Sequence, residues 1–123
     1  MMIKNQKILV IRFSSIGDII LTTPVVRALK QNDYIIHFLT KFENISTIEN
    51  NIFIDKIYVI NKSVFEIVND LKNENYELIV DLHNNLRSNI LRIILNIKTL
   101  KIRKNNFYKL LYINFGINFL KNQ

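Results

Sequence analysis

The stretch KILVIRFSSIGDIILTTPVVRALKQ, residues 7–31, decides the fold of this chain. It begins with Lys7–Phe13, a short run of apolar and β-branched residues that is typical of a strand buried on both faces of a sheet. After a polar interval, Pro24–Gln31 has the periodicity of a helix with one apolar face. A buried strand followed by an amphipathic helix begins a βαβ unit, so this stretch predicts an α/β domain.

The same alternation continues toward the C-terminus. Three apolar runs share the character of the first strand and a weaker run follows them: Tyr34–Thr40, Lys56–Ile60, Glu77–Leu82 and Leu100–Arg103. Helical patterns lie between them at Val64–Glu74, with Ser63 as its N-cap, and at Asn85–Asn96. This pattern predicts a Rossmann-like parallel sheet with helices on both faces and the strand order 3-2-1-4-5.

Composition limits the function classes. The formal net charge is +7, and no acidic residue follows Asp81, so the second half attracts nucleic acid, an anionic membrane surface or an acidic substrate. Alternatively, an AT-rich genome alone accounts for many of these lysines, because the sequence is rich in residues with AT-rich codons. Cysteine is absent, which excludes a disulfide framework and thiolate chemistry. No signal peptide is visible and the apolar runs are shorter than the roughly 18 residues of a membrane span, so we expect a cytoplasmic protein.

The predicted strand order places a ligand site. Strands one and four are neighbours in it, and the topological switch lies between them. Ligands of such sheets bind outside the carboxyl ends of the strands at this point. The loops after these two strands, Ser14–Asp18 and His83–Ser88, should therefore face one crevice.

The first loop has the sequence SSIGD, residues 14–18. It lacks the three glycines of a dinucleotide fingerprint and offers a tight turn at Gly17, two hydroxyls and the carboxylate of Asp18. That carboxylate can accept the proton of a sugar hydroxyl that attacks an anomeric carbon. Alternatively, Ser15 and Asp18 form a helix capping box. The following helix either starts with Thr23 as N-cap or runs on from Asp18 with a kink at Pro24.

The second loop belongs to DLHNNLRS, residues 81–88. The amides of Asn84 and Asn85, the guanidinium of Arg87 and the hydroxyl of Ser88 together suit a carboxylated sugar. The alternative is a helix N-terminus capped by Asn84, with Arg87 in solvent. His83 could be a base or a ligand, but it has no partner at metal-ligand spacing, and a histidine that closes a strand is usually structural.

Two further features have mainly structural interpretations. Asp81, at the end of its strand, is expected to hold the neighbouring loop by hydrogen bonds. Residues 101–109 interleave basic residues with Phe107 and Tyr108, which could bind single-stranded nucleic acid by charge and stacking. No nucleic-acid module accompanies this run, so we expect a solvated loop instead.

Taken together, the motifs resemble the N-terminal domain of family 9 glycosyltransferases, typified by ADP-heptose:lipopolysaccharide heptosyltransferases. The resemblance is carried by ILVIRFSSIGDIILTTPVVRALK (residues 8–30) and YELIVDLHNNLRS (residues 76–88), and less specifically by IRKNNFYKLLYINFGINFL (residues 102–120). It implies a GT-B architecture and an inverting, metal-independent transfer from a nucleotide-activated sugar to a lipopolysaccharide inner-core acceptor.

The resemblance also implies roles for individual residues. Asp18 would be the general base on the acceptor hydroxyl, and Ser15 and Gly17 would shape its loop. The acceptor side would be formed by residues of the second loop: Asn84, Asn85, Arg87 and Ser88. No cofactor or metal is implied, because the nucleotide-sugar is a substrate. The expected partners are an acidic glycolipid acceptor and the inner membrane surface, which the protein would contact peripherally.

The sequence departs from the family in having no counterpart of the C-terminal domain that holds the nucleotide-sugar. We therefore expect residues 1–123 to be an incomplete N-terminal, acceptor-side half of a GT-B fold. Such a chain should be inactive or nearly so unless a complementing chain supplies the donor half, and its exposed sheet edge and apolar face should favour self-association. The alternative is a non-catalytic α/β domain that binds anions, glycans or nucleic acid.

Overall fold

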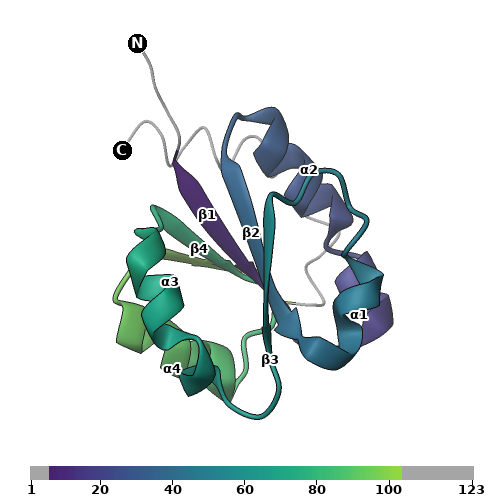
Figure 1. Cartoon of the computed structure of the whole chain (residues 1–123). Coiled ribbons are helices and arrows are strands. Elements are labelled where there is room, and N and C mark those ends of the chain that lie inside the picture. The colour runs from purple at the N-terminus through teal and green to yellow at the C-terminus, as the bar shows by residue number, and fades with distance from the viewer. Residues whose placement is uncertain (1–5, 104–123) are drawn as a thin grey trace.

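The computed structural model describes residues 6–103, which form one parallel sheet between two layers of helices (Figure 1). The strands are β1 (Lys7–Ile11), β2 (Ile35–Lys41), β3 (Lys56–Ile60), β4 (Leu78–Asp81) and β5 (Thr99–Lys101). All neighbours pair in parallel, in the order β3-β2-β1-β4-β5. The predicted fold class and strand order are therefore confirmed.

The helices are α1 (Ile16–Ile20), α2 (Thr23–Gln31), α3 (Val68–Glu74) and α4 (Leu86–Leu95), with short 3₁₀ helices η1 (Phe42–Thr47) and η2 (Val64–Glu66). Helices α1 and α2 cover one face of the sheet, and α3 and α4 cover the other (Figure 1). No helix within residues 6–103 is long and apolar enough to cross a membrane.

Strand β1 connects the two hydrophobic layers, because its side chains alternate between the faces of the sheet. Ile8 and Val10 belong to the cluster under α1 and α2, whereas Leu9 and Ile11 belong to the cluster under α3 and α4. All four side chains are fully buried. Each such side chain contributes about 1.5–3 kcal/mol relative to exposure, so β1 is anchored in both hydrophobic layers.

Most predicted elements shift by one or two residues at their ends, and the predicted helix over residues 64–74 differs most. Residues 64–74 form η2 and then α3 instead of one helix, because Glu66 folds back and accepts the backbone N–H groups of Asn61, Lys62 and Ser63. Ser63 is the predicted N-cap, and its hydroxyl accepts from the N–H of Phe65. The predicted strand Leu100–Arg103 is β5, shifted toward the N-terminus by one to two residues.

The segment between β1 and α2 differs from both sequence-based alternatives. It contains a separate short helix, α1, and the next helix has Thr22 as N-cap, with Pro24 in its first turn. The Thr22 hydroxyl donates to the carbonyl oxygen of Ile19 at 2.6 Å, which marks the break between the helices. Gly17 lies inside α1 and has no positive φ, so the predicted tight turn at this glycine is wrong.

Candidate functional site

Strands β1 and β4 end at the same level of the sheet, since Ile11 is paired with Asp81. The pairing continues one step into the loops, where the N–H of Leu82 donates to the carbonyl oxygen of Ile11 at 3.0 Å. The loops that follow the two strands therefore leave the sheet side by side, as the predicted strand order requires. This is the edge of a parallel sheet at which ligands bind.

Arg12 joins the two loops. Its Nη1 donates to the carbonyl oxygen of Leu82 at 2.8 Å, and its Nη2 donates to Oδ2 of Asp18 at 2.9 Å. Arg12 and Asp18 are both 7% exposed, so this is a buried ion pair. The predicted general base is thus held against the end of β4 by the residue that follows β1.

The capping-box alternative for Asp18 does not describe the observed contacts. Ser15 occupies the N-cap position of α1, but its side chain makes no cap hydrogen bond. Its hydroxyl instead donates to Oδ2 of Asp18 at 3.0 Å. Arg12 and Ser15 therefore orient the carboxylate together. Arg12 was not predicted from the sequence as a site residue, although a charged residue at the end of an apolar strand is a signal for a buried partner.

A second link between the loops runs from Phe13 to His83. The backbone N–H of Phe13 donates to Nδ1 of His83 at 3.1 Å, and the two rings lie 5.3 Å apart, centroid to centroid. Burial and, to a lesser degree, the Arg12 guanidinium lower the pKa of His83 to about 4. The imidazole is therefore neutral at pH 7.

Asp81 holds the loop after β4 by hydrogen bonds, as the sequence predicted. Its Oδ1 accepts the backbone N–H groups of His83 and Asn84 at 3.0 and 2.9 Å. Asn84 has a φ of 56°, a left-handed conformation that asparagine adopts more readily than most residues. The loop therefore turns sharply at Asn84 before α4 begins.

Asn85, not Asn84, caps α4. Oδ1 of Asn85 accepts from the N–H of Ser88 at 2.9 Å, and Oγ of Ser88 accepts from the N–H of Asn85 at 3.0 Å. Ser88 is fully buried, and both groups are used by the helix terminus. Arg87 is partly buried on the same helix. Of the four predicted acceptor-side residues, only Asn84 lines the neighbouring pocket.

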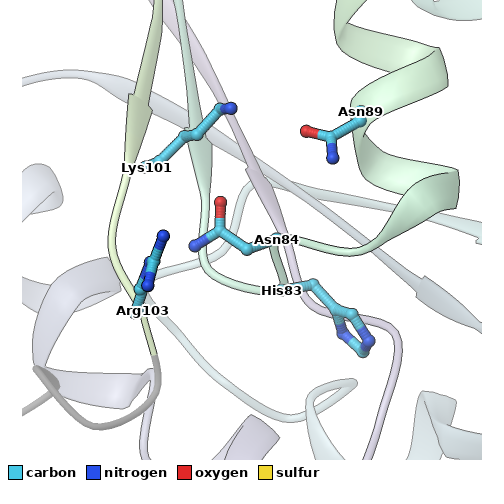
Figure 2. A pocket seen from close by; sticks show the side chains of 5 residues that line it. All are labelled: His83, Asn84, Asn89, Lys101 and Arg103. Atoms are coloured by element: carbon cyan, nitrogen blue, oxygen red, sulfur yellow. The ribbon is translucent and has the colours of Figure 1, made fainter.

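This pocket has a volume of about 510 Å³ and opens between the ends of β4 and β5. Its lining residues are His83, Asn84, Asn89, Lys101 and Arg103. In Figure 2 the side chains of Asn84, Asn89, Lys101 and Arg103 approach one another from three elements, whereas the His83 ring points away from them. The pocket is thus one strand further along the sheet than the crevice between β1 and β4 that the sequence predicts.

The pocket presents cations and amides. Lys101 and Arg103 are exposed, and the Nδ2 atom of Asn84 is buried without a hydrogen-bond partner among residues 6–103. These groups are donors that suit a carboxylate or a phosphate. The basic run 101–109, of which residues 104–109 lie outside the described residues, was a visible signal in the sequence, but it was interpreted there as a solvated loop. Within the described residues no group of three or more histidines and carboxylates could hold a metal ion.

Comparisons with known proteins agree with this fold. No family model and no curated protein matches the sequence. Among solved structures, the chain is similar to the family 9 glycosyl transferase from Veillonella parvula (TM-score 0.72, 18% identity), covering 89% of this chain and 41% of that one. It is also similar to the E. coli ADP-heptose lps heptosyltransferase II (TM-score 0.69, 19% identity), covering 85% and 33% of the two chains.

A third similar structure is the E. coli heptosyltransferase WaaC with ADP, at a TM-score of 0.65 and 16% identity, covering 80% of this chain and 34% of that chain. The chain therefore spans 33–41% of the length of these proteins. The predicted resemblance to family 9 glycosyltransferases is confirmed at the level of the fold, which this chain shares with part of each enzyme.

Proposed function

We propose that this chain is the acceptor-binding part of a glycosyltransferase that transfers a sugar from a nucleotide-sugar to a hydroxyl of an acidic glycan. The observation that carries the proposal is the bridge from Asp18 through Arg12 to the carbonyl oxygen of Leu82. It holds a carboxylate at the carboxyl ends of β1 and β4, in a fold shared with part of several glycosyltransferases. We propose a nucleotide-activated heptose as the donor, because the name of one similar E. coli structure includes ADP-heptose.

In this proposal Asp18 acts as the general base. Its carboxylate takes the proton of the acceptor hydroxyl while that oxygen forms a bond to the anomeric carbon and the nucleoside diphosphate leaves with the bonding electrons. Arg12 and Ser15, which both donate to Oδ2, direct the carboxylate. In this proposal the hydrogen-bond donors that stabilise the leaving nucleotide belong to a separate part of the enzyme.

The acidic group of the acceptor is assigned to the pocket beside β5. Asn84, Lys101 and Arg103 supply the donors there. We propose that Asn85 and Ser88 act only by capping α4 and so holding the loop that contains Asn84. This revises the acceptor set expected from the sequence, because the cations come from the end of β5 and not from α4.

Transfer can be tested in a chimera in which this chain replaces the matching part of the Veillonella parvula protein. Asp18→Asn, which keeps the shape of the side chain, should lower the transfer rate by about 100-fold or more. Asp70→Asn, on the exposed surface of α3, is the matched control and should leave the rate unchanged. Circular dichroism verifies folding of each variant, and transfer that survives Asp18→Asn rules out Asp18 as the base.

Acceptor binding can be tested on the unmodified chain. Methyl glucuronide should bind more tightly than methyl glucoside, and the difference should shrink with added salt. Asn84→Gly removes the amide but accepts the left-handed backbone, and Lys101→Ala removes one cation. Both should weaken glucuronide binding, whereas Lys72→Ala on α3 should not. Equal affinity for the two sugars would refute the acidic-group assignment.

The pocket also favours a second candidate, a binding module that holds an acidic glycan without chemistry. The two candidates differ at Asp18, which does not line the pocket. A module would bind methyl glucuronide, would be indifferent to Asp18→Asn and would give no transfer in the chimera. Loss of transfer in Asp18→Asn with binding retained favours the enzyme.

A further inference from the structure

We propose that His83 is a fixed hydrogen-bond donor to the sugar acceptor, neutral and with its proton on Nε2, and that it serves neither as a base nor as a metal ligand. The identity of its ligand rests on the proposed function. The state of the ring does not, because it follows from contacts within the chain.

The tautomer follows from the contact with Phe13. A backbone N–H can only donate, so Nδ1 of His83, 3.1 Å from the nitrogen of Phe13, must present its lone pair. A neutral imidazole carries one proton, which must then lie on Nε2. Neither nitrogen retains a free lone pair, since that of Nδ1 is used and Nε2 is protonated. The ring therefore has nothing with which to accept a substrate proton or bind a metal.

The surroundings keep the ring in this state. Burial opposes a second proton, and the nearby cations Arg12 and Lys41 oppose it further. The carboxylates of Asp81 and Asp18 act in the other direction but do not compensate, so the pKa of His83 remains well below 7. Protonation would also break the hydrogen bond from Phe13. The Nε2–H donor is thus present throughout the physiological pH range.

The position of the ring points to a ligand. His83 follows β4 directly, and its ring is tilted against that of Phe13, in the loop after β1. His83 is one of the residues that line the pocket, but its ring points away from the cations of Lys101 and Arg103 (Figure 2). Arg12 and Asp18 are close enough to affect its charge. The ring therefore lies against the loop that leads from β1 to Asp18, while the residue itself borders the proposed anion pocket.

The Nε2–H group completes the assignment. Among residues 6–103 no group accepts a hydrogen bond from it. A neutral donor beside the loop of Asp18, on a residue that lines the cationic pocket, fits a hydroxyl or ring oxygen of a sugar whose acidic group lies in the pocket. It would position the acceptor without competing with Asp18 for the proton.

The state of the ring can be tested by long-range ¹H–¹⁵N spectra of the full chain labelled with ¹⁵N-histidine. His83→Asn assigns the His83 signals, because His37 contributes the other set. We expect one Nε2–H tautomer that does not change between about pH 5.5 and about pH 8. A titration within this range, or a protonated Nδ1, would overturn the proposal whatever the protein binds.

Ligand contact is tested by adding methyl glucuronide to the same sample. The His83 Nε2 signal should shift in step with binding. If the sugar binds, as judged by isothermal titration calorimetry, and Nε2 does not move, the inference fails while the proposed function stands. If the wild-type chain binds no acidic sugar, the proposed acceptor role is refuted. The proposed sugar ligand of His83 is then refuted as well.

Two substitutions separate the roles of the two ring nitrogens. His83→Asn keeps an acceptor near Nδ1 for the Phe13 N–H but removes the distal donor, and should raise the Kd for methyl glucuronide about three- to tenfold. His83→Gln places an amide near the Nε2 position and should recover part of this loss. In the chimera, the pH profile of transfer should keep its shape in His83→Asn, and loss of one limb of the profile would identify His83 as a base.

Discussion

At the scale of single residues, stability is most sensitive at the buried pair of Arg12 and Asp18. Arg12→Met would leave the Asp18 carboxylate buried without its cation, and removal of one partner of such a pair costs about 3–5 kcal/mol. We expect urea denaturation to show a loss of that order in the free energy of unfolding. Adding Asp18→Asn should restore part of it, because no ionised group then remains. A loss below about 0.5 kcal/mol in Arg12→Met would mean that the pair is solvated.

The two histidines contribute to how stability depends on pH. The pKa of His83 is lowered to about 4 and that of His37 is also lowered, in each case mainly by burial. Between pH 6.5 and about 4 the unfolded chain therefore binds protons that the folded chain does not, and acidification favours unfolding. We expect the free energy of unfolding to fall across this window and His83→Asn to flatten the fall. An unchanged slope in this variant would argue against a depressed pKa at His83.

Glu74 acts in a lower pH window. Its carboxylate accepts from Lys7 at 2.8 Å, from the Tyr58 hydroxyl and from Lys56 at 3.1 Å, which together lower its pKa to about 2. Its contribution is complete above pH 4.5 and is lost as the pH falls toward 2. Glu74→Gln should be destabilised at neutral pH and nearly insensitive to pH in this window. Parallel curves for Glu74→Gln and the wild type would contradict the assignment.

At the scale of elements, α1 carries a glycine that its backbone does not need. Gly17 has no positive φ, and a Cβ added there would have no atom within 4 Å. Gly17→Ala should therefore raise the free energy of unfolding by up to about 1 kcal/mol through helix propensity. If the same variant loses transfer in the chimera, the glycine serves close approach of substrate to the Asp18 loop. A destabilised Gly17→Ala would mean that α1 is strained.

Helix α4 separates capping from binding along one element. Asn85→Ala removes the N-cap and should lower the free energy of unfolding by about 1 kcal/mol, as measured by urea denaturation. Asn89→Ala, one turn further on and in the pocket lining, should instead weaken binding of methyl glucuronide. The two variants are each other's control. A binding defect confined to Asn85→Ala would indicate direct contact of this residue with the acceptor.

The elements also show what the sequence could and could not predict. Strands β1 to β4 were predictable because each is an apolar run with β-branched residues, and the strand order followed from the handedness of crossovers. The separate helix α1 and the division of residues 64–74 were not, because Thr22 and Glu66 redirect the chain by hydrogen bonds to the backbone that leave no periodic trace. That the loops after β1 and β4 leave the sheet at one edge was predictable from the strand order. The buried pairing of Arg12 was not, because it depends on where a long side chain points within the folded loops.

At the scale of the whole molecule, an apolar patch lies beside the proposed site. Ile16, Ile20, Leu21 and Phe42 are each at least 53% exposed, and α1 contacts η1. Such a patch favours association between copies of the chain. Light scattering at rising concentration should show self-association that Ile20→Asn combined with Phe42→Asn reduces. A wild-type chain that stays monomeric at high concentration would show that this surface is tolerated in water.

The Arg12 bridge has a consequence for engineering. The two loops at the end of the sheet share one guanidinium, so a length change or a foreign sequence in one of them disturbs the support of the other. Grafting either loop alone from a related enzyme should misplace the carboxylate even when every residue of the graft is correct. A specificity transplant should succeed only when both loops and the arginine between them are moved as a single block.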